Sequence, residues 1–189
     1  MIRIAVVGDI GSGKSHISRQ FGCPVFNADD QVAKIYKKSR KCFFRLKKAI
    51  PDYILSYPIK KSEINNAILK NQSNLKKIVK IVHPLVRSKM NIFIKKNKNK
   101  KIVVLDIPLL IENRINKKKD IIIFVDAKKR EINKRLKKRP NINLEIINKF
   151  RKLQLPLEVK KKKSNFIIKN NFTNNYVKKS VKRILGKVF

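Results

Sequence analysis

The chain has 189 residues, of which 42% are hydrophobic, so it is long enough for one α/β domain with a small insertion. Tryptophan is absent and aromatic residues make up 7%, so isoleucine, leucine and valine must form most of the core. The formal net charge of +37 admits a nucleic-acid partner, but Lys, Asn and Ile, which all have AT-rich codons, are overused together. Biased genome composition explains the charge better, and we expect no specific nucleic-acid partner.

Two further classes are disfavoured by pattern. Cys23 and Cys42 form no CxxC pair and have no histidine pair nearby, so we expect no zinc site. The longest apolar runs, such as DIIIFVDA, are far too short to cross a bilayer, so we expect no membrane partner. Because Met1 runs directly into the first apolar run, with no cleavable leader, we expect a cytoplasmic protein with reduced thiols, acting as a monomer.

The first elements follow from short apolar runs and their punctuation. The aliphatic run at 3–7, closed by Gly8, is typical of a buried parallel strand. Helical spacing follows from Lys14 to Phe21. The segment CPVFNADD predicts a second short strand that ends at 27–30 and passes directly into a helix.

The middle of the chain changes character. Between residues 37 and 97 strand-like runs disappear, and apolar residues recur at helical spacing, as in 64–69 and 75–82. Three prolines interrupt this stretch, and we expect His83-Pro84 to close a helix. We interpret 37–97 as a helical insertion.

Strand patterning then resumes. The remaining pattern predicts strands at 102–108, 121–127 and 165–171 and helices at 128–138 and 177–185. The full order is that of an α/β fold with a mostly parallel sheet and helices on both faces. The sheet domain would then comprise residues 1–36 and 98–189.

Residues 8–15, GDIGSGKS, match the phosphate-loop pattern G-x-x-x-x-G-K-[ST], with a strand before and a helix after. Glycines let the backbone approach a phosphate closely, and amide groups at a helix N-terminus form an anion-binding nest. Lys14 can reach β- and γ-phosphate oxygens, and the Ser15 hydroxyl suits Mg²⁺. We therefore expect a nucleoside triphosphate with Mg²⁺ as cofactor; a turn that binds nothing is the alternative. The expected nucleotide-binding residues here are Gly8, Gly11, Ser12, Gly13, Lys14, Ser15 and His16.

Two carboxylates follow predicted strands at the edge where ligands of parallel sheets bind. Asp29 could take a proton from an attacking hydroxyl, or it could cap the helix that follows. Asp106 could contact Mg²⁺ through water, or it could be a solvated loop residue.

Arg135 and Arg139 lie one helical turn apart and could clamp a γ-phosphoryl group, although such spacing also arises by chance in so basic a chain. Arginine offers a planar fork that lysine lacks, which favours the functional interpretation. His83, with Arg87 one turn further on, taken alone is more typical of a structural histidine.

Six stretches together resemble the dephospho-CoA kinases, a family of P-loop nucleotide kinases with an adenylate-kinase-like core. In chain order they are VVGDIGSGKS, FNADDQVAKIY, HPLVR, VLDIPLLIEN, INKRLKKR and LQLPLEVKKKKSNFIIKNN. The resemblance covers nearly the whole chain, and its strength lies in the order and spacing of the stretches.

The resemblance implies transfer of the γ-phosphoryl group of ATP to the ribose 3′-hydroxyl group of dephospho-CoA, giving coenzyme A and ADP. Asp29 would activate that hydroxyl, while Lys14 and Arg139 would absorb transition-state charge. Residues 136–160, here called the lid segment, would close over the nucleotide. The resemblance places Lys61, His83 and Arg87 with Asp29 on the acceptor side and Arg135, Arg139, Gln154 and Asn170 on the nucleotide and lid side.

The chain departs from the family pattern at several positions, among them Asn165, where an aspartate is frequent. Asn27 stands where the family usually has an aspartate, so it cannot be a charged ligand. Asp9 replaces a common glycine and adds a negative charge near the phosphates. Lys61 stands roughly where the family has an arginine, and Phe172 stands where a glycine is frequent.

Two rival functions remain. The chain could phosphorylate another small acceptor, although the HP and PLL-x-E stretches argue against this. It could also be a nucleic-acid-binding protein whose phosphate loop is only structural, but no basic stripe interleaved with aromatic residues supports that function.

Overall fold

The computed structural model describes residues 1–140 and 142–188, which divide into two compact units. The first unit comprises Met1–Asn27, Asn97–Asn143 and Phe150–Phe189, and the second comprises Ala28–Lys96 and Leu144–Lys149. From the sequence, the helical insertion was expected to span residues 37–97. In the structure, the main segment of the helical unit begins at Ala28 and ends at Lys96.

A five-stranded sheet forms the centre of the first unit. Its strands run in the order β2-β3-β1-β4-β5, and every pair is parallel. The strands are β1 (Ile2–Gly8), β2 (Val25–Asn27), β3 (Ile102–Asp106), β4 (Ile121–Asp126) and β5 (Phe166–Lys169). The aliphatic runs of β1, β3 and β4 are buried on both faces, as central parallel strands require, whereas the edge strand β5 leaves Ile167 exposed. The predicted parallel sheet is confirmed.

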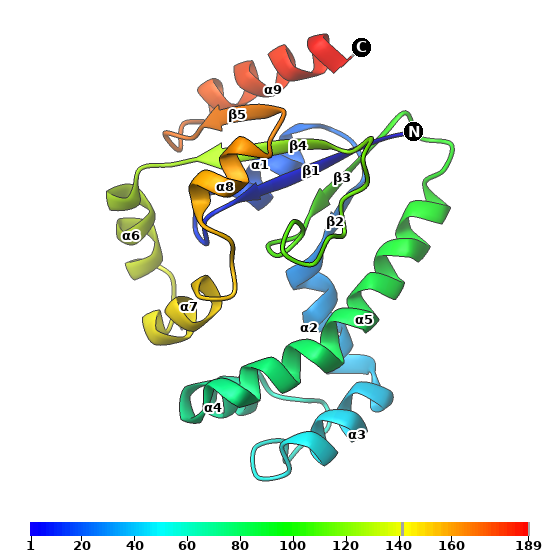
Figure 1. Ribbon diagram of the computed structural model, residues 1–189, viewed down its shortest axis with the longest axis vertical. Helices are drawn as coiled ribbons and strands as arrows, with labels where there is room; N and C mark the ends of the chain where they lie inside the picture. The colour runs from blue at the N-terminus through cyan, green and yellow to red at the C-terminus, as the bar shows by residue number, and fades with distance from the viewer. Residues whose placement is uncertain (141, 189) are drawn as a thin grey trace. The chain divides into compact units, whose positions relative to one another are not determined.

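Helices cover both faces of this sheet. Apolar side chains of α1 (Lys14–Gln20) and α9 (Asn174–Val188) join one core cluster with the strands. On the other face α8 (Leu157–Lys162) contacts β1, and Figure 1 draws it in front of the sheet with α1 behind. The helix after β4, α6 (Lys129–Lys137), buries Ile132 and Leu136.

The second unit is helical. It contains α2 (Ala28–Lys38), α3 (Arg40–Ala49), α4 (Lys61–Lys70), α5 (Gln72–Lys96) and the first six residues of α7 (Leu144–Arg151). Each of α2, α3 and α4 packs on α5, which buries Leu75, Ile78, Val82, Val86 and Met90 along one side. The long α5 therefore supports the other helices of this unit.

The expected helix end at His83-Pro84 is wrong, because α5 continues through Pro84 to Lys96. Proline removes one backbone hydrogen bond, which ordinarily interrupts a helix. Here Val82 and Val86, on either side of the proline, both remain buried in the unit. Packing of this apolar side outweighs the local penalty.

The sequence pattern did not indicate separate helices within residues 136–160. The end of α6, all of α7 and the start of α8 fall in this stretch. The ammonium group of Lys149 in α7 donates to the main-chain oxygens of Ile68 (2.9 Å) and Leu69 (2.6 Å) in α4. A cation at a helix C-terminus is a favourable partner for such carbonyl groups.

Within the described residues, no helix is long and apolar enough to cross a membrane. No group of three or more His, Cys, Asp or Glu side chains that could hold a metal ion occurs there either. Both cysteines are free thiols.

We expect Cys42 to resist alkylation in the native protein. Its side chain is fully buried, and burial raises the pKa of the thiol to about 11. At pH 8 only about one thiol in a thousand would be the reactive thiolate. Mass spectrometry after iodoacetamide treatment should find Cys42 modified only after unfolding, with half-buried Cys23 as the internal comparison. Rapid native labelling of Cys42 would contradict the packing of α3 described here.

Candidate nucleotide site

The loop between β1 and α1 has a backbone that only glycine can adopt at key positions. Gly13, the N-cap of α1, has φ 95°, and a Cβ atom there would clash with the side-chain nitrogen of Asn170. Gly8 has φ 149°, and a Cβ there would lie 2.7 Å from the main-chain oxygen of Val125. Both glycines therefore serve a tight turn packed directly on neighbouring backbone and side chains.

Asn170 fixes the loop from the end of β5. Its side-chain Nδ2 donates to the main-chain oxygen of Ser12 at 2.8 Å, and its main-chain amide donates to the main-chain oxygen of Asp126 at 2.6 Å. Asn170 is buried, so the structure places it against the backbone of the loop. Sequence reasoning had assigned Asn170 to the nucleotide and lid side without this contact.

Lys14 and the start of α1 supply positive charge. Lys14 is buried, and its ammonium group donates to the main-chain oxygens of Asp9 (2.7 Å) and Gly8 (3.3 Å). No side chain of the described residues caps the N-terminus of α1 at Gly13. Amide groups at a helix start and a lysine held at the same loop form the arrangement that binds phosphate. His16 is half-buried in the first turn of α1.

Asp9 is held by two different donors. Its Oδ1 accepts from the amide of Ile10 at 2.6 Å and from Nε of Arg151 at 3.1 Å. Its Oδ2 accepts from a terminal nitrogen of Arg151 at 3.0 Å, so the ion pair is bidentate. Sequence reasoning did not identify Arg151, although the unusual negative charge of Asp9 implied that some cation should neutralise it.

Ser15, Asn27 and Asp106 meet at the carboxyl edge of the sheet. Nδ2 of Asn27 donates to Asp106 Oδ2 at 2.7 Å and lies 3.3 Å from the Ser15 hydroxyl oxygen. Asn27 and Asp106 are direct neighbours in the register of β2 and β3, which explains the contact. Ser15 and Asp106, the two predicted magnesium ligands, therefore share the side-chain amide of Asn27 as a partner. From the sequence, Asn27 was noted only as a departure from the family pattern.

This donor set fits Mg²⁺. A hydroxyl and a carboxylate are hard ligands, and Mg²⁺ in nucleotide sites uses few protein ligands and keeps several waters and phosphate oxygens. Ser15 and Asp106 would hold the ion, in direct contact or through water.

Arg135 and Arg139 do not share a helical face as predicted. The helix ends at Lys137, and Arg139 lies in the turn beyond it, with its amide donating to the oxygen of Leu136 at 3.1 Å. Arg135 instead lies over the ring of Phe172, 4.5 Å from the centroid. Phe172 has φ 63°, in the left-handed region that favours glycine, and the cation–π contact offsets part of that strain. Both arginines are exposed.

A buried ion pair ties the β3–β4 connection to the lid segment. The ammonium group of Lys160, which is fully buried, lies 2.7 Å from Glu112 Oε1 and donates to Gln154 Oε1 at 3.0 Å. Glu112 Oε1 also accepts from the amide of Leu155 at 3.0 Å. Removing one member of such a pair typically costs about 3–5 kcal/mol, so these contacts fix residues 154–160 firmly. The expected place of Gln154 on the nucleotide and lid side did not include this contact with Lys160.

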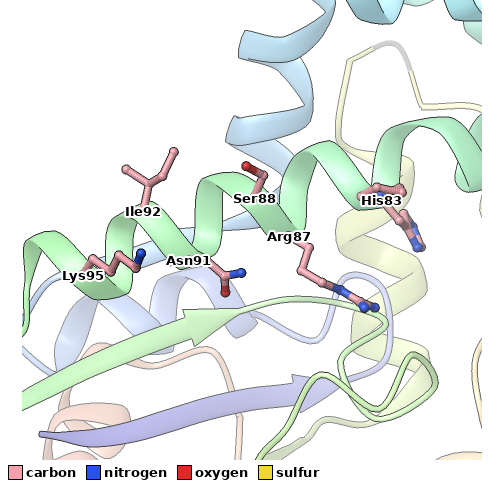
Figure 2. A pocket seen from close by; sticks show the side chains of 7 residues that line it. His83, Arg87, Ser88, Asn91, Ile92 and Lys95 are labelled. Atoms are coloured by element: carbon pink, nitrogen blue, oxygen red, sulfur yellow. The ribbon is translucent and has the colours of Figure 1, made fainter.

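The remaining predicted residues lie in the second unit. Asp29 is exposed in the first turn of α2, and Lys61 is the exposed first residue of α4. His83 and Arg87 line a pocket of about 490 Å³ together with Ser88, Asn91 and Lys95 of α5. Figure 2 shows the His83 and Arg87 side chains projecting from the same side of that helix. The pocket therefore brings His83 and Arg87 together, and Lys61 does not line it.

The sequence matches the family model of dephospho-CoA kinase over residues 2–175. The dephospho-CoA kinase of Wolbachia pipientis wMel is 34% identical over 187 residues, which cover 96% of this chain and 95% of the relative. The chain belongs to the dephospho-CoA kinase family. The resemblance inferred from six sequence stretches is thereby confirmed.

Solved structures agree on the fold of the dephospho-CoA kinase family. A Thermus thermophilus protein, TT1252, aligns with a TM-score of 0.75 at 24% identity, over 100% of this chain and 98% of its own. The dephospho-CoA kinase from Campylobacter jejuni aligns with a TM-score of 0.62 at 22% identity, with the same coverage. These likenesses support the P-loop kinase fold.

We expect Asn27→Asp to make the stability of the protein depend on Mg²⁺. The new carboxylate would face Asp106 across a contact that is now 2.7 Å, so without a cation the like charges should lower the melting temperature by a few degrees. Added MgCl₂ should reverse most of this loss. Asn27→Ala removes the amide without adding charge and serves as the control. Equal responses of both variants to MgCl₂ would contradict a cation site at Ser15 and Asp106.

Proposed function

We propose that this chain transfers the γ-phosphoryl group of ATP to the ribose 3′-hydroxyl group of dephospho-CoA, giving coenzyme A and ADP. Family membership supplies the overall reaction, ATP-dependent phosphorylation of dephospho-CoA, the last step of coenzyme A biosynthesis. The observation that carries the proposal on this chain's own residues is the complete phosphate loop at 8–15, with Asn27 and Asp106 at its edge. The enzyme acts as a monomer in the cytoplasm, where its thiols stay reduced.

The nucleotide half of the site is the better supported. The loop amides and the start of α1 receive the β- and γ-phosphates of ATP, and Lys14 exchanges its present main-chain acceptors for phosphate oxygens. Ser15 and Asp106 would hold Mg²⁺, which would supply neutralisation of the phosphate charge. Asn27 orients both ligands through its amide group.

Asp29 acts as the base that receives the proton of the attacking hydroxyl. Asn27 contacts Ser15 and Asp106, and Asp29 follows it by only two residues. Two residues of chain span at most about 7 Å, so connectivity alone keeps the Asp29 backbone within that distance of Asn27. Phosphoryl transfer needs positioning more than covalent help, and a carboxylate at this point of the chain suits that task.

The second unit receives the acceptor. His83 and Arg87 share one pocket, and an arginine there can bind a phosphate group of dephospho-CoA through paired hydrogen bonds. Lys61 adds a point charge at the start of α4. Residues 37–97 form the acceptor-binding insertion in this proposal.

The lid segment at 136–160 excludes water from the transferring group. Arg139 stabilises the charge of the transition state, and Arg135 contributes beside Phe172. Exclusion of water favours attack by the alcohol over hydrolysis.

The decisive experiment compares ATP consumption with and without dephospho-CoA, followed by the mass of the product. We expect acceptor-dependent release of ADP and a product heavier than dephospho-CoA by one phosphoryl group. Shikimate and nucleoside monophosphates serve as control acceptors. Faster turnover with any of these would replace dephospho-CoA as the proposed substrate.

We expect Lys14→Ala to abolish measurable turnover. The substitution removes the cation that the loop holds for the β- and γ-phosphates. Steady-state assays should show a loss of at least about 10³-fold in kcat/KM. Lys162→Ala, which removes an exposed lysine at the end of α8, is the control for loss of charge alone. Retention of activity in Lys14→Ala would remove the phosphate loop from the mechanism.

We expect Asp29→Asn to lower kcat by about 10²–10⁴-fold while the Kd for ATP changes by less than about twofold. The amide keeps the size of the side chain and cannot accept the proton. Asp30→Asn is the matched control, because Asp30 is the exposed neighbour in the same turn of α2. Normal turnover in Asp29→Asn would exclude Asp29 as the base.

A further inference from the structure

Arg151 and Asp9 form a contact that the proposed mechanism does not use. The two residues are 142 positions apart in the sequence, yet the guanidinium group of Arg151 binds both oxygens of the Asp9 carboxylate. The side chains are 26% and 13% exposed, so the pair is partly shielded from solvent and its geometry is fixed by two parallel hydrogen bonds. Such a pair is more than a chance encounter of a surface lysine with an acid.

The position of Asp9 makes the pair relevant to nucleotide binding. Asp9 is the second residue of the phosphate loop, and its main-chain oxygen accepts from both the Ser12 amide (3.2 Å) and Lys14 (2.7 Å). Its carboxylate accepts a hydrogen bond from the main-chain amide of Ile10 at 2.6 Å, and this amide belongs to the same backbone turn. An unpaired carboxylate here would repel a triphosphate and compete with it for loop amides.

We propose that Arg151 is a positioning residue for ATP binding: by holding the Asp9 carboxylate in a bidentate ion pair, it cancels the negative charge within the phosphate loop. The inference rests on the proposed nucleotide site and goes beyond it, because Arg151 acts through Asp9. Arg151 lies in the lid segment, so the affinity of the phosphate loop for phosphate depends on a residue of the lid.

The test measures Kd for ATP, ADP and AMP, without acceptor, for the parent chain and for Arg151→Met. ATP and ADP place a β-phosphate in the loop and AMP does not. We expect the Kd of ATP and ADP to rise about tenfold, equivalent to about 1.4 kcal/mol, and that of AMP to change by less than about twofold. If Arg151 had only a structural role, Arg151→Met would raise the Kd of ATP, ADP and AMP alike, or would lower the melting temperature without a selective change in Kd.

Second-site variants make the test specific. In the Arg151→Met background, both Asp9→Gly and Asp9→Asn should return the Kd of ATP to within about threefold of the parent value, because both remove the unpaired charge. Arg183→Met, which removes an exposed guanidinium group from α9, is the matched control and should leave the Kd unchanged. Melting curves of every variant check that it is folded.

The outcomes separate this inference from the proposed function. Failure of both Asp9 substitutions to restore ATP binding, or recovery with Asp9→Gly alone, would overturn the role of charge cancellation by Arg151. An unchanged Kd of ATP in Arg151→Met would overturn it as well. A parent chain that binds no ATP would instead remove the nucleotide site itself.

Discussion

The close packing of the turn between β1 and α1 is the constraint on which the nucleotide site depends. At Gly13 the backbone is left-handed, and the Asn170 side chain occupies the space that a Cβ atom would need. Asn170 in turn is held by the main chain of Asp126, at the end of the neighbouring strand β4. The loop is therefore shaped from both sides before any ligand arrives. This arrangement lowers the cost of ordering backbone amides around a phosphate.

The sheet determines which other groups reach this loop. Because β1 lies between β3 and β4, the carboxyl ends of three neighbouring strands converge beside Gly8. Register places Asp106 opposite Asn27, and Asn27 then reaches Ser15. A neutral amide at this point lets a carboxylate approach at hydrogen-bonding distance without repulsion. Asn27 cannot be a charged ligand, as expected from the sequence, but its amide group contacts both ligands proposed for Mg²⁺.

The parallel sheet, the phosphate loop and the helical character of the middle segment could be predicted because each has a local signal. Aliphatic runs mark strands buried on both faces, and glycine spacing marks the loop. The contacts that could not be predicted are those without a local signal. Arg151 is one of 49 lysines and arginines, and nothing near it in sequence indicates that it pairs with Asp9. Two predictions that depend on helix ends were wrong in opposite directions. Tertiary packing extends α5 through Pro84, whereas α6 ends two residues before Arg139.

Aspartate and glutamate are scarce in this chain, so the contacts of each one help to show its role. The chain has only 12 aspartates and glutamates against 49 lysines and arginines. In the first unit, Asp9, Asp106, Glu112 and Asp120 each receive a specific donor, respectively Arg151, Asn27, Lys160 and Arg3. Glu112 and Asp120 serve structure, because the buried cations Lys160 and Arg3 next to them would be costly without an acceptor, whereas Asp106 is also a proposed Mg²⁺ ligand. Asp29 lies at the surface in the first turn of α2, where a carboxylate is favourable beside the helix N-terminus. A role for Asp29 in phosphoryl transfer would therefore be added to a stabilising role and would not replace it.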